Sequence, residues 1–418
     1  MTSSHESVVP GEALRTVEPA SGLVASSSRR AQIAGCDPSS HRIVALEGMR
    51  GFAALLVFFV HFSALLGSYA TPRYALPWIT RYACGLGHTG VDVFFVISGF
   101  LMYGIVMRKP VPFSNYLWRR AKRIYPVFLF VLVIYIATLY ATPGEVRIPH
   151  DRTAAVGFIL ANLAMLPGMF SITPVITVAW SLSYEWFYYL ALPFTVWALS
   201  LRRWSPRKRI ALMLTICAVQ ALLCVVHLSV HPRLILFGAG ICLWELATNW
   251  EVANHLRYRG ELVAIMLAAA TMGGVGFHLM RLNEISPGGA SMNSLDAAVL
   301  FVGVFALTLY ALYFRGILNR IFSLAGLRWV GNISYSYYLI HGLTLHVLAK
   351  IAKRILGTQP LSAPAYGMLF LFSLAATIAV AALLFLAIER PFSLSTRAKG
   401  ERERVPATVQ PATSSRAA

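Results

Sequence analysis

The chain has 418 residues, of which 57% are hydrophobic and only 13% are charged, and its mean hydropathy is +0.64. Soluble domains carry about 25% charged residues, so this composition excludes an ordinary soluble protein and predicts one that crosses a membrane several times. The formal net charge of +19 is compatible with nucleic-acid binding, but basic residues on the cytoplasmic side of a membrane protein explain it more simply.

The two ends of the chain differ in composition from its middle. Residues 1–42 are rich in Ser, Ala and Val and lack the apolar core of a signal peptide, which predicts a disordered cytoplasmic tail. Residues 393–418 are polar and rich in Ala, Arg, Pro and Thr, and we expect a second disordered cytoplasmic tail there. Residues 43–392 are expected to form one membrane domain.

Ten apolar stretches are long enough to span a bilayer. They lie at 43–67, 86–107, 124–141, 177–200, 210–230, 233–248, 262–280, 295–314, 332–351 and 365–388. A further stretch, 153–167, is short, and if it crossed, the basic cluster Arg202–Arg209 would move to the outer side, against the positive-inside rule. We therefore predict an all-α polytopic bundle of about ten transmembrane helices with both termini cytoplasmic, and residues 153–176 as an outer re-entrant or interfacial segment.

The cysteines do not form a metal-binding pattern. Their number is odd, no CxxC occurs, and no cluster of His, Asp or Glu joins them. They are Cys36, Cys84, Cys217, Cys224 and Cys242. We expect neither a disulfide framework nor a metal site.

A polar pair interrupts the first apolar stretch. Ten residues without a polar side chain separate Arg50 from His61. Eleven positions at about 100° each close almost three turns, so both residues lie on one helix face, about 16 Å apart along the axis. Because these side chains are costly inside a membrane, the pair indicates a functional site. The structural alternative is an Arg50 that snorkels to the interface and a His61 that is hydrogen-bonded in the packing.

Asp92 stands near the outer end of the second predicted span, across a hairpin from His61. A carboxylate beside a histidine fixes its tautomer and supports the imidazolium, as a general base requires. Asp92 is therefore a candidate partner of His61. The alternative is a charge at the start of a helix, placed at the interface.

The loop after the second span is basic, with Arg119, Arg120, Lys122 and Arg123. Such a loop can bind lipid phosphates or fix the topology. Alternatively, it holds a polyanionic cofactor such as coenzyme A, since the guanidinium fork suits phosphate.

A second polar group lies in the fourth predicted span, where Ser181, Glu185 and Tyr188 are spaced i, i+4, i+7 on one helix face. A glutamate inside a span must be paired, protonated or turned toward a wet cavity. Tryptophan and tyrosine are ordinary at a membrane interface, but the carboxylate is not. Glu185 is therefore a candidate functional residue.

The ninth predicted span places His341 at mid-membrane depth, with Ser334, Tyr337 and Tyr338 on much of the same face. A histidine bonded to a neighbouring tyrosine is the structural explanation. The functional one is that Tyr338 or His341 stabilises an oxyanion.

These stretches together resemble the acyltransferase-3 family of membrane acyltransferases over about residues 40–392. The resemblance is carried by Arg50 and His61 with ten residues between them, Val91–Phe100, Arg119–Pro126, Trp180–Glu185, Ser334–His341 and Glu389–Phe392. Residues 50–54 also resemble the subgroup that modifies bacterial exopolysaccharides and O-antigens.

The resemblance implies a ten-helix protein of the bacterial inner membrane that moves an acyl group, commonly acetyl, from acyl-CoA to a hydroxyl of a cell-surface polysaccharide or lipid-linked glycan. It implies that His61 is the catalytic histidine and Arg50 its motif partner. The donor is a substrate, so no permanently bound cofactor is expected, and no nucleic acid is expected as a partner.

Both lines of argument lead to acyl transfer from a thioester to an alcohol. His61 would take the proton of the hydroxyl, oriented by Asp92 or Glu185. Arg50 would hold the pantetheine arm or a phosphate, and Arg119–Arg123 the nucleotide end. Ser181 is a further candidate for contact with substrate.

Two other classes of function stay open at this point. A glycan or lipid transporter or flippase would also place charges inside a bundle, but it would not transfer an acyl group. In a non-catalytic structural subunit, replacement of His61 would leave surface acetylation unchanged.

Overall fold

The computed structural model describes residues 38–71, 75–108, 110, 112–141, 148–149, 151–170, 172–226, 231–285 and 291–394. The chain divides into a unit of Met1–His41 and a unit of Arg42–Ala418. Cys36 and almost all of the predicted tails at 1–42 and 393–418 lie outside the described residues. The fold below is that of the second unit.

Regular structure in the described residues is helical apart from one isolated bridge between Ala70 and Leu361, which confirms the all-α prediction. The longer helices are α2 (Pro38–Leu66), α3 (Leu76–Gly87), α4 (Thr89–Arg108), α5 (Phe113–Ala141), α6 (Arg152–Leu163), α7 (Ala179–Ala198), α8 (Pro206–Val225), α9 (Ile235–Asn249), α11 (Tyr258–Ile285), α12 (Ser294–Tyr313), α15 (Ser334–Leu356) and α16 (Ala363–Leu384). The short helices are α10 (Val252–His255), α13 (Ile317–Phe322) and α14 (Ala325–Asn332).

Seven helical segments of the described chain are long and apolar enough to cross a membrane. They are Val44–Tyr69, Leu76–Arg108, Phe113–Thr138, Pro206–Val225, Tyr258–Ile285, Ser294–Tyr313 and Ala363–Ser393. Each coincides with one of the ten predicted spans, so the protein is a multi-pass membrane protein.

The other three predicted spans, 177–200, 233–248 and 332–351, fall on α7, α9 and α15. These helices form, but α9 has only 15 residues, α7 carries a glutamate among tyrosines and tryptophans, and α15 ends in basic residues. The count of ten and the cytoplasmic termini therefore stay predictions. Helix α6, within the predicted re-entrant segment, has 12 residues, about 18 Å, and is too short to cross a hydrocarbon core of about 30 Å by itself.

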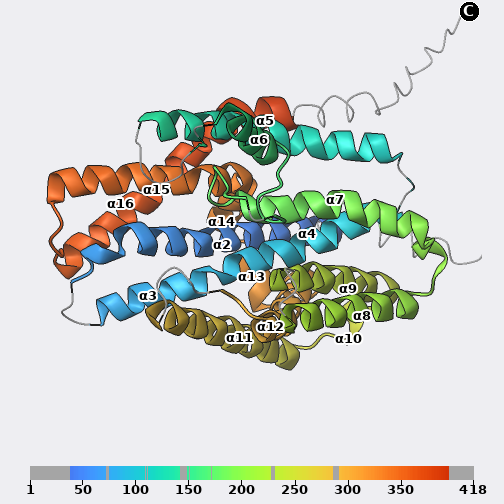
Figure 1. The fold of residues 1–418 in the computed structure, drawn as a ribbon. Coiled ribbons are helices and arrows are strands. Elements are labelled where there is room, and N and C mark those ends of the chain that lie inside the picture. Colours follow the sequence, from blue (N-terminus) through green and yellow to red (C-terminus); the bar gives the residue numbers. More distant parts are fainter. Residues whose placement is uncertain are drawn as a thin grey trace, which may run out of the picture. The chain divides into compact units, whose positions relative to one another are not determined.

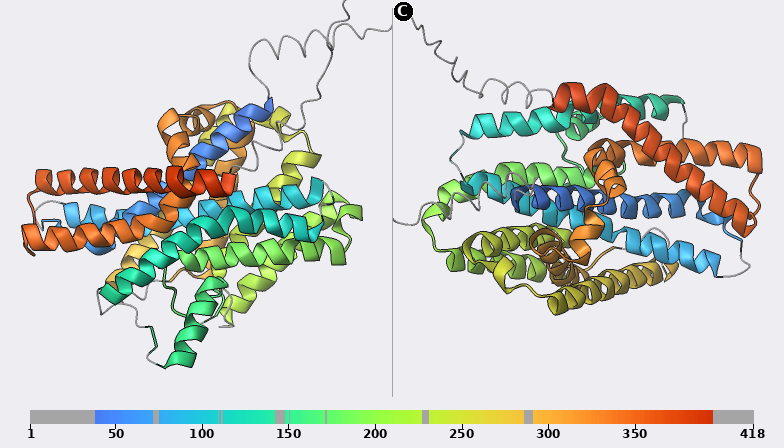
Figure 2. Two further views of the ribbon diagram at one scale, coloured as in Figure 1. Left: turned by 90° about the horizontal axis from the view of Figure 1, so that it is seen from above. Right: turned by 180° about the vertical axis from the view of Figure 1, so that it is seen from behind.

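Helix α4 lies among the other helices of the bundle. Figure 1 shows it beside α2, with α5 and α7 on one side and α8, α9, α11 and α12 on the other, and the view from behind in Figure 2 shows the same order. Helix α4 packs most extensively against α9 and also contacts α7 and α12, while α15 packs against α16. This arrangement brings α2, α4, α5, α7 and α15 around one point.

Glycines allow the close approach of α4 and α9. A Cβ atom on Gly99 would lie 2.2 Å from the carbonyl oxygen of Phe237, and one on Gly240 would lie 2.1 Å from that of Val96. These distances leave no room for a side chain on either face. Within a membrane the hydrophobic effect does not drive helices together, because the lipid tails are also apolar. Small residues at the contact let the two backbones approach closely, so that van der Waals packing holds the helices together.

Substitution of Gly99 by alanine is expected to destabilise the protein, because the new methyl group must push α9 away from α4. Overpacking of this kind costs about 1–3 kcal/mol. Thermal unfolding of the detergent-solubilised protein measures the effect as a lower midpoint. The matched control is Gly274→Ala in α11, where nothing lies within 4 Å of the added Cβ. An equal midpoint for both variants would contradict the close packing of α4 on α9.

The last described segment, η4 (Phe385–Leu394), continues α16 as a π-helix and packs against α5. Its Glu389 is 1% exposed and accepts hydrogen bonds from the backbone N–H and the hydroxyl of Ser336, at 3.2 and 2.6 Å. Ser336 lies in the first turn of α15. One segment therefore contacts two of the helices that surround the site described next.

Candidate active site

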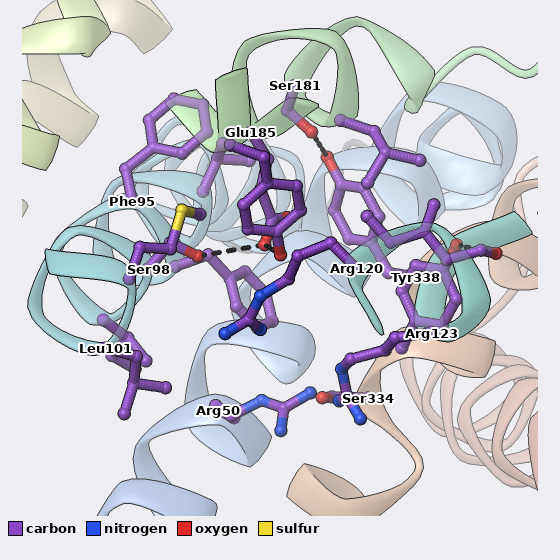
Figure 3. Close-up of a pocket in the computed structure, with 18 residues that line it drawn as sticks. Arg50, Phe95, Ser98, Leu101, Arg120, Arg123, Ser181, Glu185, Ser334 and Tyr338 are labelled. Carbon is purple, nitrogen blue, oxygen red and sulfur yellow. Dashed lines mark hydrogen bonds between the residues drawn. The ribbon is translucent and has the colours of Figure 1, made fainter. Parts of the chain in front are cut away.

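A cavity of about 140 Å³ lies between α2, α4, α5, α7 and α15 (Figure 3). Its polar lining residues are Arg50, Ser98, Arg120, Arg123, Ser181, Glu185, Tyr189, Ser334, Tyr335 and Tyr338. Three arginines against one glutamate give the lining a formal excess of two positive charges. Such a lining favours an anionic ligand, because guanidinium groups form strong charge-assisted bonds with phosphate and carboxylate.

The three arginines come from two helices and converge on the same space. Figure 3 shows the side chains of Arg50, Arg120 and Arg123 turned toward the region below Glu185. Arg120 and Arg123 are three positions apart on α5 and therefore share a helix face. Arg119 is exposed and is not part of the lining, since one position rotates it by about 100° away from that face.

Aromatic rings hold the Arg120 guanidinium in place. It lies over the ring of Tyr116 at 5.5 Å and over that of Tyr189 at 5.3 Å. Contacts of this kind contribute about 0.5–2 kcal/mol each, more when desolvated. These contacts fix the guanidinium at the wall of the cavity, where it can bind an anion.

Glu185 supplies the carboxylate of the cavity. Its Oε1 accepts a hydrogen bond of 2.6 Å from the hydroxyl of Tyr189 and one of 3.4 Å from that of Ser98. Of the predicted polar stripe on α7, Ser181 and Glu185 line the cavity. Tyr188 does not, because its hydroxyl donates to the carbonyl of Leu234 and its ring stacks elsewhere.

Two further hydroxyl groups meet at the wall of the cavity. Ser181 Oγ lies 2.7 Å from the hydroxyl of Tyr338, so helices α7 and α15 are joined there. Both residues were candidates from the sequence. Either hydroxyl can turn its proton toward a developing negative charge, which makes the pair a candidate oxyanion donor.

Asp92 pairs with Arg233 and not with His61. The side chain of Asp92 is fully buried, and its Oδ2 accepts a hydrogen bond of 2.9 Å from Nη1 of Arg233. The same nitrogen donates to the carbonyl of His88 at 2.7 Å. A buried carboxylate requires a buried cation, and removing one partner of such a pair costs about 3–5 kcal/mol. The expectation that Asp92 orients His61 is thus not met by this structure.

Arg233 was missed from the sequence because it is the first residue of the predicted span 233–248, at the edge of an apolar stretch. The buried charge of Asp92 was the signal that a cation had to be near. Between α8 and α9, His231 stacks on Trp180 with ring centroids 5.1 Å apart. Burial and then the neighbouring Arg233 lower the pKa of His231 to about 4, so this ring is neutral at pH 7.

His61 contacts His341 and does not line the cavity. The two ring centroids lie 4.9 Å apart with the rings at 74°. The sequence placed Arg50 and His61 along one passage, but the cavity reaches only Arg50. Ala54 and Val57, on the same face of α2 between them, are 0% and 3% exposed and fill that space.

His341 connects the two halves of the site. It is fully buried, its Nδ1 lies 2.9 Å from the carbonyl oxygen of Tyr337, and its ring centroid is 6.1 Å from that of Tyr338. Tyr338 lines the cavity. A continuous series of side chains therefore runs from the cavity through Tyr338 and His341 to His61.

Among the described residues, no group of three or more His, Cys, Asp or Glu is placed to hold a metal ion. The four described cysteines, Cys84, Cys217, Cys224 and Cys242, are not joined by disulfide bonds.

Comparison with known proteins decides the family. The family model described as an acyltransferase domain matches residues 43–386, which covers most of the chain. The chain belongs to the acyltransferase-3 family. It is therefore a membrane acyltransferase, and the cavity with its basic lining lies inside the family domain.

Several curated relatives share this domain. The chain is 30% identical to the exopolysaccharide production protein ExoZ of Rhizobium meliloti over 327 residues, 75% of this chain and 92% of ExoZ. It is 25% identical to the peptidoglycan O-acetyltransferase OatA of Listeria monocytogenes, over 73% of this chain and 51% of that protein. It is 27% identical to the O-acetyltransferase OatA of Staphylococcus aureus, over 44% of this chain and 29% of that protein. No solved structure matches.

Two features of this acyltransferase-3 domain stand out in the described residues. The cavity carries fixed positive charge from α2 and α5. His61 lies outside that cavity against His341, and no hydrogen bond to a carboxylate or a cation is found for it among the described residues.

Proposed function

We propose that this protein transfers an acyl group, in the first place acetyl, from acyl-CoA to a hydroxyl of a cell-surface polysaccharide or a lipid-linked glycan, in the bacterial cytoplasmic membrane. The observation that carries the proposal is the cavity in which Arg50, Arg120 and Arg123 converge inside an acyltransferase domain. The acceptor class is supported by the names of the relatives, an exopolysaccharide production protein and O-acetyltransferases.

The chemistry of the lining supports acyl-CoA as the donor. Coenzyme A carries several phosphate charges at one end and a thioester at the other. Arg120 and Arg123 bind the phosphates in this proposal, and Arg50 binds a phosphate or the pantetheine arm. Each charge-assisted hydrogen bond contributes about 1.5–3 kcal/mol, so two or three arginines give useful affinity without a permanently bound cofactor.

In the transfer step the acceptor hydroxyl must reach His61, which lies outside the cavity and is connected to it through His341 and Tyr338. His61 takes the proton of the acceptor hydroxyl while the oxygen attacks the thioester carbonyl carbon. The carbon–sulfur bond breaks, the thiolate of coenzyme A leaves, and it is protonated at the expense of the imidazolium. Ser181 and Tyr338 donate to the oxygen that becomes negative in the transition state. Glu185 fixes the hydroxyls of Ser98 and Tyr189 at the cavity wall.

The test is acyl transfer itself. Membranes from a strain that lacks the gene are compared with membranes of the complemented strain, using [14C]acetyl-CoA and the polysaccharide of the deletion strain as acceptor. We expect alkali-labile label in the polysaccharide only with the complemented membranes, and mass spectrometry of surface polysaccharide should show the matching loss of acetyl groups in the deletion strain. Polysaccharide that reaches the surface fully acetylated in the deletion strain, with no label transferred, would overturn the proposal, and a defect in export alone would point to a transporter.

A further inference from the structure

The buried imidazole of His341 has a defined tautomer. Its Nδ1 lies 2.9 Å from the carbonyl oxygen of Tyr337, one turn earlier in α15. A carbonyl oxygen only accepts hydrogen bonds, so Nδ1 must carry the proton. In a neutral imidazole, Nε2 is then a bare lone pair. The doubly protonated ring would place a charge without a counter-ion in a fully buried position, which costs several kcal/mol.

The Nε2 atom of His341 has no hydrogen-bond partner within the described residues. A buried acceptor that stays unpaired costs about 1–3 kcal/mol, so such an atom in a native structure calls for an explanation. The hydroxyls of the two neighbouring tyrosines do not supply one. Tyr337 lies 3.4 Å from the hydroxyl of Thr377, and Tyr338 bonds Ser181.

His61 is the neighbouring residue that can donate a hydrogen bond to Nε2 of His341. Its ring centroid lies 4.9 Å from that of His341, with the rings at 74°. A neutral imidazole always has one N–H to donate. The two carboxylates that the sequence offered as partners of His61 are bonded elsewhere, Asp92 to Arg233 and Glu185 to Tyr189. No hydrogen bond joins the two rings in the structure. A donor and an acceptor, each without another described partner, nevertheless lie on adjacent rings, so a turn of the His61 side chain would bring its N–H to Nε2 of His341.

We propose that His341 is the positioning residue of His61: Nε2 of His341 accepts the N–H of His61 and so leaves the other nitrogen of His61 as the lone pair that takes the proton of the acceptor hydroxyl. The proposal rests on acyl transfer with His61 as base. It assigns to a neutral histidine the part that a carboxylate has in hydrolytic triads, which is to hold the ring in one tautomer and orientation.

The arrangement has a chemical consequence for the reaction. When His61 takes a proton, its N–H toward His341 becomes a charge-assisted donor, and the hydrogen bond strengthens as the imidazolium forms. His341 does not itself become protonated, because its remaining lone pair is used in that bond. Its Nδ1–H stays on the Tyr337 carbonyl, which prevents the ring from turning.

Two substitutions of His341 distinguish a role in positioning His61 from a role in packing alone. Asparagine places its amide near the position of Nδ1, so His341→Asn keeps a donor for the Tyr337 carbonyl and loses the acceptor at Nε2. Glutamine reaches the position of Nε2, so His341→Gln can offer an oxygen to His61. Both side chains are polar and smaller than or similar to histidine, so a general effect on folding should be alike in the two.

We expect His341→Asn to lose about 10²-fold in kcat for transfer of [14C]acetyl from acetyl-CoA, with the KM for acetyl-CoA unchanged. His341→Gln should stay within about tenfold of the wild type. In a His61→Ala background, His341→Asn should cause no further loss, because residues that act as one unit are not additive.

The pH dependence supplies a readout that packing would not move. Within the part of the chain that the structure describes, the titratable groups found to interact with His61 are His341 on α15, through ring contact, and His88 between α3 and α4, electrostatically. Without the acceptor on His341 the imidazolium of His61 is less stabilised. The acid limb of the kcat/KM profile should then lie at lower pH in His341→Asn than in the wild type, and His341→Gln should restore it.

Equal activity of the two variants, whether both high or both low, would overturn the positioning role, as would additive losses in the His61→Ala background. These outcomes are distinct from failure of the proposed function, in which the wild-type protein itself transfers no label.

Discussion

His61→Ala is expected to lower kcat for acyl transfer by roughly 10²–10⁴-fold, because the acceptor hydroxyl then lacks the base that removes its proton. The KM for acetyl-CoA should change little, since His61 lies outside the cavity that binds the donor in our proposal. Steady-state kinetics with membranes, [14C]acetyl-CoA and isolated polysaccharide measure both constants.

The matched control for this variant is His255→Ala. His255 lies exposed in α10, away from the cavity, so its removal should leave both constants unchanged. A His61→Ala protein that is as active as this control would remove His61 from the mechanism. The role of the arginine-lined cavity in donor binding would be untouched by that result.

The second large effect is expected on α5, where adjacent arginines differ in position. Arg120→Ala should raise the KM for acetyl-CoA by about 10- to 100-fold. A charge-assisted bond to a phosphate contributes about 1.5–3 kcal/mol, and each 1.4 kcal/mol of binding free energy changes the affinity about tenfold. Its guanidinium lies in the cavity between Tyr116 and Tyr189. The change in kcat should be smaller than the change in KM.

Arg119→Ala is the control for that experiment, since it removes the same charge one residue away on the exposed side of α5. Little change in KM is expected for it. If both substitutions raised KM equally, the basic loop would act through its overall charge and not through the cavity. Raising the salt concentration separates the cases further, because exposed charges are screened more strongly than buried ones.

Much of the site could be predicted from single residues, because a charge in an apolar helix is costly wherever that helix is placed. Glu185 and Arg50 were identified in this way, and both line the cavity. The exclusion of Arg119 required the helix rotation of α5 relative to its neighbours. The sequence shows which residues of α5 share a helix face, but not which of these faces is turned toward the cavity.

The partners of these residues could not be predicted, because they depend on how distant helices pack. Arg233 lies 141 positions from Asp92 in the chain and meets it only because α9 packs closely against α4. The contact between His61 and His341 likewise joins the first and the second-last long helices. In both cases the sequence showed a polar group that needed a partner, and the fold selected which partner it received.

Segment η4 gives the end of the described chain an influence over the chemistry far from it in sequence. Glu389 is hydrogen-bonded to the first turn of α15, and the rest of η4 packs against α5. These are the helices that carry Tyr338 and the arginines Arg120 and Arg123, which line the cavity and to which we assign oxyanion stabilisation and phosphate binding. Segment η4 thus fixes the distance between α5, where the donor would bind, and α15, where its acyl group would be transferred.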